Sequence, residues 1–284
     1  PKIKRSNFIK ASYHFRFFLV FILAILGFIF LYSFIDNPFG KEQILNKFFF
    51  AALRILLCFV AAGIIVVIFI STGYVSMKNT SQIYIKPITN FTRKYGSLAI
   101  AILLLIGLYR IADVVMGVVA NIFYLEKGFD IKEIATYSKF FGVFATILGG
   151  FLGGIFALKF GTMRALFLGA LIAASSNLLF AWLAISPISI KFLIIVITAD
   201  NISSGFAGAA FVVYLSGLTS IKFTATQYAL FSSIMLFLPK LIAGYSGSWV
   251  DIMGYANFFT LTAILGIPVL LMIIWISKVA PVKN

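Results

Sequence analysis

The chain has 284 residues, of which 62% are hydrophobic and only 11% are charged, and its formal net charge is +15. Soluble globular domains average about 25% charged residues. A chain this apolar is therefore predicted to use lipid as its solvent, as an integral membrane protein. The basic excess then marks loops facing the cytoplasm and anionic headgroups, and we expect no nucleic-acid partner.

Eight apolar segments are long enough to cross a bilayer core, which takes about 20 helical residues. They are 16–35, 50–72, 97–123, 137–158, 163–186, 191–216, 226–248 and 257–278. Backbone amides in lipid must be bonded within the protein, and these runs are too long and too uniformly apolar for barrel strands. The predicted fold is all-α and integral to the membrane, with about eight transmembrane helices.

The apolar and polar stretches divide the chain into three parts. Residues 1–75 predict a two-helix transmembrane hairpin, and residues 97–284 predict a unit of six spans. The basic segment 76–96 between them predicts a cytoplasmic linker, and its part 84–96 favours a short amphipathic helix at the membrane interface.

The basic residues also predict an orientation. Fourteen fall on one side of the eight spans: Lys2, Lys4, Arg5, Lys10, Arg16, Lys78, Lys86, Arg93, Lys94, Lys159, Arg164, Lys222, Lys278 and Lys283. Five fall on the other side: Lys41, Lys47, Lys127, Lys132 and Lys191. Cytoplasmic loops carry the excess of Lys and Arg, so both termini are expected in the cytoplasm.

Six charged residues lie inside the predicted spans, where each costs ~2.5–3.5 kcal/mol on insertion scales. They are Arg54, Arg110, Asp113, Lys139, Asp200 and Lys240. Arg54 and Lys139 lie near span ends, where long side chains reach the headgroups. Arg110 and Asp113 are three residues apart and are expected to pair on one helix face.

Asp200 and Lys240 lie on neighbouring spans, and a second pair between them is a further expectation. Two interpretations remain open for these four charges. They are structural ion pairs that hold helices in register, or they line a polar lumen for a charged solute. In the second case Asp113 and Asp200 are the candidate proton-coupling residues, because burial and a nearby cation act on a carboxylate in opposite directions.

The short turn in GGFLGGIFALKFGTMRALFLG (149–169) resembles the loop motif of the major facilitator superfamily. Its matching residues, the candidate gating loop, are Gly154, Lys159, Gly161 and Arg164. Leu158 stands where the family has an acid, a departure typical of the C-terminal half of these transporters. The resemblance implies that residues 97–284 form a six-helix C-terminal half.

Three further stretches resemble the AmpG family of muropeptide permeases: PITNFTRKYG (87–96), LYRIADVVMGVVANIFYLEKGFDIKEIA (108–135) and FTATQYALFSSI (223–234). The residues that match are Tyr109, Arg110 and Asp113 in the second stretch and 224–230 in the third. The resemblance implies proton-coupled import of GlcNAc–anhMurNAc peptides across the bacterial inner membrane, for peptidoglycan recycling.

The resemblance also implies roles for four polar residues in substrate binding. Arg110 and Lys240 suit the carboxylates of such a substrate through charge-assisted hydrogen bonds. Asn201 and Gln227 suit its hydroxyl and amide groups. Gln227 lies near a predicted helix start, so a local capping role is an equal alternative.

Several alternatives stay open. The chain contains only one predicted six-helix half, so it is expected to be a truncated gene product or a half transporter that assembles with a chain supplying the N-terminal half. The hairpin is either the end of that half or an insertion. An acetyl-CoA-type or other organic-anion transporter, and a non-transporting remnant or assembly subunit, are the rival functions. With Cys58 and His14 as the single residues of their types, we expect no enzyme activity, metal or cofactor.

Overall fold

A computed structural model describes the backbone of residues 2–40 and 43–279, and the side chains of residues 15–279 except 41, 42 and 44. Within these ranges there is no strand, and eight helical segments are long and apolar enough to cross a membrane. The prediction of an all-α membrane protein with eight spans is therefore confirmed. The orientation stays a prediction, and several side chains that it uses, with His14, lie outside the described ones: Lys2, Lys4, Arg5, Lys10, Lys41 and Lys283.

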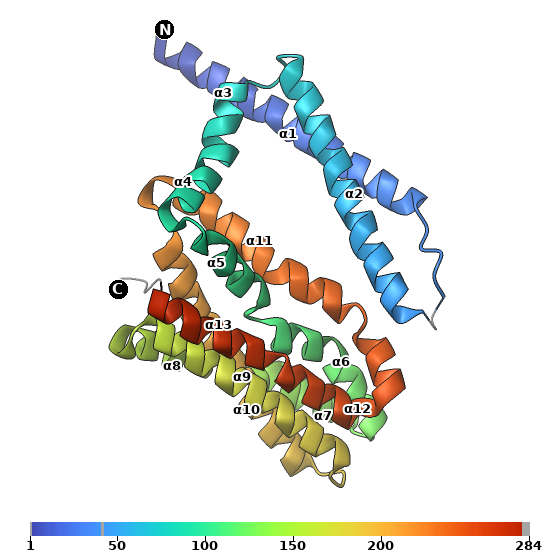
Figure 1. The fold of residues 1–284 in the computed structure, drawn as a ribbon. Helices are drawn as coiled ribbons and strands as arrows, with labels where there is room; N and C mark the ends of the chain where they lie inside the picture. The colour runs from blue at the N-terminus through green and yellow to red at the C-terminus, as the bar shows by residue number, and fades with distance from the viewer. Residues whose placement is uncertain (1, 41–42, 280–284) are drawn as a thin grey trace. The chain divides into compact units, whose positions relative to one another are not determined.

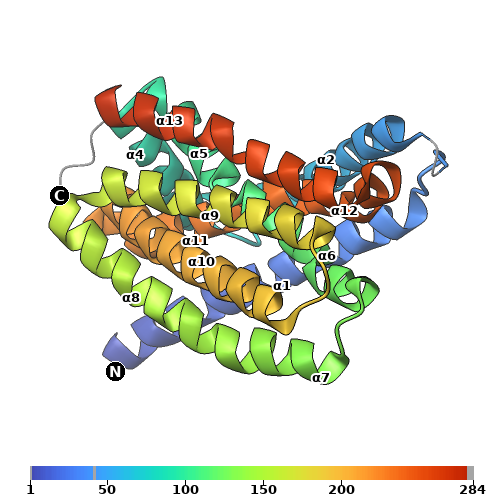
Figure 2. The same cartoon turned by 90° about the horizontal axis from the view of Figure 1, so that it is seen from below.

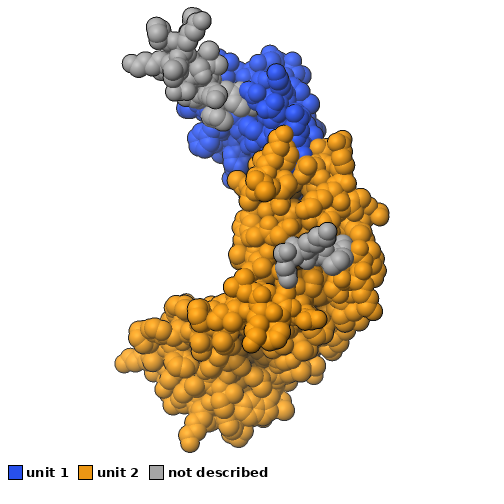
Figure 3. All heavy atoms as spheres, turned by 90° about the vertical axis from the view of Figure 1, so that its left-hand side faces the viewer, with its two compact units in different colours: residues 1–87 blue, residues 88–284 orange. Residues whose placement is uncertain are grey.

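The chain divides into two compact units, residues 1–87 and residues 88–284, which are coloured separately in Figure 3. The first unit contains α1 (Lys2–Phe34), α2 (Ile44–Ser71), α3 (Met77–Thr80) and the π-helical segment η1 (Ser81–Ile85). α4 (Lys86–Tyr95) runs across the division. The predicted linker 76–96 is thus almost entirely helical.

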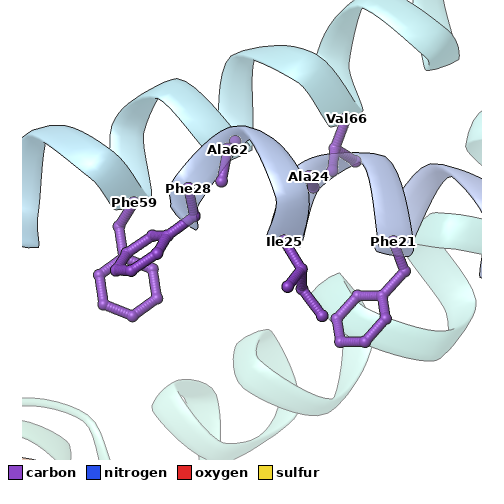
Figure 4. Close-up of a pocket in the computed structure, with 8 residues that line it drawn as sticks. Phe21, Ala24, Ile25, Phe28, Phe59, Ala62 and Val66 are labelled. Carbon is purple, nitrogen blue, oxygen red and sulfur yellow. The ribbon is translucent and has the colours of Figure 1, made fainter. Parts of the chain in front are cut away.

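The hairpin formed by α1 and α2 is predominantly apolar over Phe15–Phe34 and Leu45–Ser71. A groove of about 460 Å³ runs between the two helices and is lined only by apolar residues, several of them labelled in Figure 4. Arg54 bonds at the end of the hairpin: its Nη1 donates to the carbonyl of Ile35 at 2.6 Å, and its guanidinium lies 3.7 Å from the ring centre of Tyr32. Two contacts with Tyr32 and Ile35 thus hold this cation, while its buried Nε has no hydrogen-bond partner among the described residues.

The second unit is built from six spans. Its first three contain α5 (Leu98–Leu108), α6 (Ile111–Lys127), α7 (Ile131–Ile134), η2 (Ala135–Phe141), α8 (Gly142–Phe160) and α9 (Thr162–Ile185). Its last three contain α10 (Ile190–Leu218), η3 (Ile221–Phe223), α11 (Thr224–Ala243), α12 (Ser246–Ile264) and α13 (Gly266–Val279). α12 contains a non-helical residue, Gly254 (φ 75°, ψ 164°), between the oppositely directed α11 and α13 in Figure 1.

Two kinds of contact hold this unit together. An aromatic cluster joins α6, α9 and α12, because the ring centres of Phe123 and Phe180 lie 4.9 Å and 5.2 Å from that of Phe259.

Glycines allow α8 and α10 to touch backbone to backbone. A methyl group at Gly205 would overlap the carbonyl of Thr146, and one at Gly149 would overlap the backbone of Ile202. Small residues at such crossings permit dispersion contacts that lipid tails would otherwise provide.

The predicted span 97–123 contains a break that its apolar pattern did not indicate. α5 ends at Leu108 and α6 begins at Ile111, and Arg110 has a non-helical backbone (φ −100°, ψ 16°). The break places Asp113 in the first turn of a new helix. Discontinuous helices at this depth are the way in which many transporters expose backbone and charge to a substrate path.

Candidate functional site

The centre of the site is an ion pair at the break between α5 and α6. Arg110 Nη2 lies 2.7 Å from Asp113 Oδ2, which confirms the pair predicted from their spacing. The same nitrogen donates to Ser204 Oγ of α10 at 2.8 Å. Asp113 also lies in the first turn of α6, where the helix dipole favours negative charge. The pair therefore connects the first span of the unit to the fourth.

The pair is not saturated by the hydrogen bonds that surround it. Arg110 Nε and Asp113 Oδ1 are buried, and neither has a hydrogen-bond partner among the described residues. The side chain of Arg110 keeps 24% of its surface exposed. Gly208 lies one turn after Ser204, and its missing side chain leaves room beside the guanidinium. The arrangement thus retains polar atoms that a charged ligand or a proton can engage.

Tyr109 holds the break in place from the other side. Its hydroxyl donates to the carbonyls of Leu166 (3.2 Å) and Ala207 (3.4 Å), and its ring stacks on Phe211 with centres 4.6 Å apart. These bonds reach α9 and α10 from the residue next to Arg110. The break is therefore anchored on both neighbouring spans.

Asp200 lies one helical turn before Ser204 on α10. It is close enough to interact electrostatically with Asp113 and Arg110. The predicted ion pair with Lys240 is wrong, because among the described side chains no cation lies within 4.0 Å of Asp200. Asp200 therefore interacts electrostatically with Arg110 and Asp113 without a direct bond to either, and the three residues are called the charged group below.

Lys240 lies on α11, near the level of the helix break but exposed. Leu238, two residues earlier, approaches Gly107 of α5. Pro239 is buried inside the same helix. Lys240 thus shares a membrane depth with the ion pair without touching it, and its role in substrate binding stays a prediction.

The two predicted amide residues are directed elsewhere. Asn201 accepts from Thr146 Oγ1 of α8 at 2.9 Å and donates to the carbonyl of Ile197 at 2.8 Å, so it links α8 to α10. Gln227 is buried near the start of α11, where its Oε1 accepts from the backbone nitrogen of Ser220 at 2.7 Å. Both observations favour local structural roles, and neither residue contacts the ion pair through a described hydrogen bond.

The residues of the predicted gating loop lie around the turn between α8 and α9. Gly161 has a left-handed backbone (φ 91°, ψ 154°), which explains why glycine stands between two helices that follow each other directly. Lys159 lies over the ring of its neighbour Phe160, at 5.5 Å from the centre, and Arg164 is exposed. Gly154 has open space around it. Gating by this turn stays a prediction.

The sequence interpretation missed a second polar network beside the break. Asn177 of α9 is fully buried, and its Nδ2 donates to the carbonyl of Ala112 (3.2 Å) and to Thr262 Oγ1 of α12 (3.1 Å). Ser246 donates to the carbonyl of Val115 at 2.9 Å. An asparagine in the middle of an apolar span was the available signal, since such groups are costly unless they are bonded.

No family model matches the sequence. Among curated proteins, "Putative transporter AmpG 4" of Rickettsia felis is 34% identical over 194 residues, which cover 68% of this chain and 46% of the relative. "Putative transporter AmpG 1" of Rickettsia bellii is 37% identical over 193 residues, covering 67% and 47% of the two chains. An uncharacterized protein of Haemophilus influenzae is 32% identical over 236 residues, covering 78% and 55%.

The chain spans about half the length of these curated relatives. The similarity confirms the resemblance read from the motifs around Arg110 and Gln227. Together with eight apolar spans, it identifies a multi-pass membrane protein of a transport family. The chain belongs to the AmpG family of transporters.

Proposed function

We propose that this chain is the C-terminal half of a proton-coupled importer of anhydromuropeptides, GlcNAc–anhMurNAc peptides, in a bacterial inner membrane. The observation that carries the proposal is the Arg110–Asp113 ion pair at a break in the first span of the unit, with Asp200 beside it. Charges of this kind are rare in membranes and mark ion and substrate pathways. The family membership supports transport, and the muropeptide substrate follows from the AmpG resemblance.

The proposed substrate is large, sugar-bearing and anionic. Arg110 supplies the cation for one of its carboxylates, through the guanidinium surface that the Asp113 bond leaves free. A guanidinium binds a carboxylate in two parallel hydrogen bonds, which fixes orientation as well as charge. Lys240 supplies a second cation from α11.

The proton is assigned to the two carboxylates. Protonation of Asp113 would break its bond to Arg110 and release the guanidinium, so proton and substrate binding would be coupled at one pair. Asp200 has no described ion partner to lose and is the second carrier. A transporter of this superfamily has two six-helix halves around a midplane site. The proposal therefore requires a second six-helix half, whether it belongs to the same protein or to a partner chain.

Uptake into membrane vesicles tests this function. Vesicles that contain the chain with its second six-helix half are supplied with labelled anhydromuropeptide, with and without a proton gradient. We expect accumulation that depends on the gradient, its abolition by Asp113→Asn or Asp200→Asn, and normal accumulation in Asp251→Asn. Asp251 is the matched control because it is an exposed aspartate on α12. Normal gradient-driven uptake in both variants would contradict the coupling role.

Arg110→Gln separates substrate binding from coupling. Loss of a charge-assisted hydrogen bond is worth about 1.5–3 kcal/mol, so the half-saturating substrate concentration is expected to rise about tenfold or more. Competition by coenzyme A in place of muropeptide would favour the organic-anion alternative. Absence of both uptake and ligand-induced stabilisation of the purified protein would favour the non-transporting alternative.

A further inference from the structure

A small groove opens between α9 and α13, away from the ion pair. Its volume is about 210 Å³, and it lies between the first turns of α9 and the last turns of α13. The two helices run side by side in Figure 2. The lining residues are Met163, Arg164, Phe167, Ile273, Ile274 and Ser277. The groove therefore has an apolar floor and a single charged side chain, a guanidinium.

Charge is distributed unequally between the two ends of this unit. The segments that meet at the groove end, 88–97, 154–170, 214–230 and 270–279, contain six Lys or Arg residues and no Asp or Glu. At the opposite end, the segments 121–135, 184–194 and 246–257 contain four acidic and three basic residues. The groove thus opens onto a surface whose charge is complementary to an anion.

The residues around the groove are of the kinds that gather at the boundary between headgroups and tails. Trp275 and Lys278, both exposed, flank Ser277 on α13. Trp residues gather at the level of lipid headgroups, and Lys and Arg near span ends reach the same level. Arg164 is exposed and has no ion-pair partner among the side chains that the structure describes. Its guanidinium is therefore free to bind an anion at the level of the headgroups, next to the apolar side chains that line the groove.

We propose that this groove binds an anionic phospholipid, with the phosphate on Arg164 and one acyl chain along Phe167 and Ile274. A free phosphate would bind the guanidinium but leave the apolar side chains of the groove without a partner. A zwitterionic lipid such as phosphatidylcholine would offer the same phosphate to the guanidinium, but its choline cation would face the Lys and Arg residues gathered at this end and weaken its binding. The site is independent of the transport proposal, since it requires only that α9 and α13 lie in a bilayer.

Lipid binding to the purified full chain tests the site. Native mass spectrometry measures half-saturation for phosphatidylglycerol and for phosphatidylcholine with identical acyl chains. We expect tighter binding of phosphatidylglycerol, and about fivefold weaker binding in Arg164→Gln, the equivalent of ~1 kcal/mol per basic residue near anionic lipid. Arg164→Lys keeps the charge and should restore most of the preference. Lys191→Gln removes an exposed cation at the opposite end and should change nothing.

A second variant tests the apolar part of the groove. Ile274→Trp narrows the groove without changing charge and is expected to weaken phosphatidylglycerol binding. The inference is overturned if phosphatidylcholine binds as tightly, if Arg164→Gln and Lys191→Gln behave alike, or if inorganic phosphate displaces the lipid at equal concentration. Because the readout is bound lipid and not uptake, a failure here is distinct from a failure of the proposed transport.

Discussion

The hairpin of the first unit and the six spans of the second solve the problem of packing in lipid differently. The second unit joins its helices through side-chain bonds to backbone carbonyls, as at Ala112 and Val115, and through glycines that bring backbones into contact. Apart from two side-chain bonds near its loop, from Asn37 and Arg54, the hairpin packs α1 on α2 with apolar side chains, and Val20, Ala24 and Cys58 are among the few residues that it buries.

The difference in packing indicates in which unit the relative positions of the helices are fixed most closely. Apolar contacts between helices are replaceable by lipid tails, so the hairpin tolerates small displacements. Hydrogen bonds and backbone contacts are short-ranged and directional, so the six-span unit permits few arrangements of its helices. The charged group at Arg110 lies in the unit whose helix positions are fixed by directional contacts, as a binding site requires.

The largest effect is expected at the crossing of α8 and α10. Gly205→Leu forces a side chain against the carbonyl of Thr146, which is backbone and cannot rotate away. Overpacking of this kind costs about 3 kcal/mol or more, and we expect loss of folded protein after detergent extraction. Size-exclusion chromatography and unfolding by increasing SDS measure it.

Gly154→Leu is the matched control for Gly205→Leu. Gly154 lies on α8 as well, and the first side-chain carbon added there would meet nothing within 4 Å. A normal elution profile for both variants would show that the α8–α10 crossing is not close-packed in the membrane.

The second effect concerns the buried asparagine that the sequence interpretation missed. Asn177→Ala removes two donated hydrogen bonds between α9 and its neighbours. Interhelical hydrogen bonds in membranes average about 0.6 kcal/mol with a maximum near 1.7, so a loss of about 2 kcal/mol with the missing side-chain contacts is expected. Unfolding in SDS measures the change.

Asn121→Ala controls for the loss of an asparagine elsewhere in the unit. Asn121 is exposed on α6. Equal destabilisation by the two variants would contradict a special role for the α9 network.

Hydropathy alone predicted the eight spans, because a helix in lipid needs a long apolar run and little else. The spacing of Arg110 and Asp113 predicted their contact, although Arg110 proves to be the residue that precedes α6 and not a residue inside a helix. These features are local. Each depends on residues that are close in the chain and on one known periodicity.

The break at Arg110 and the bonds of Tyr109, Asn177 and Ser246 were not predictable in the same way. No proline marks the break, and the partners of these side chains are backbone carbonyls of other helices. Which carbonyl lies within reach depends on how the spans pack, and that packing is set by contacts such as Gly205 against Thr146. A polar residue inside an apolar span indicates that a hydrogen-bond partner exists, but it does not identify that partner.

A smaller effect is expected at the contact between α12 and α6. Ser246→Ala removes one hydrogen bond to the carbonyl of Val115 and leaves the packing almost unchanged. We expect a loss of about 0.6 kcal/mol, again by unfolding in SDS. Ser233→Ala is the control, because Ser233 is exposed and bonds only within its own helix, to Ala229. A loss of the same size in the control would assign the effect to the helix rather than to the contact.

The smallest effect is expected in the hairpin, at Gly27. This glycine of α1 lies close to α2, as the glycines of the second unit lie close to their neighbouring helices. A methyl group at Gly27 would lie 2.5 Å from Ile65 Cδ1, the far end of a flexible side chain. Rotation of Ile65 relieves the overlap, and alanine is favoured over glycine in a helix by about 1 kcal/mol. Gly27→Ala should therefore change stability by less than about 0.5 kcal/mol, whereas Gly63→Ala, which meets nothing within 4 Å, should be stabilising. A loss at Gly27 as large as that at Gly205 would show that the hairpin is also packed through its backbone, and the contrast between the two units would then fail.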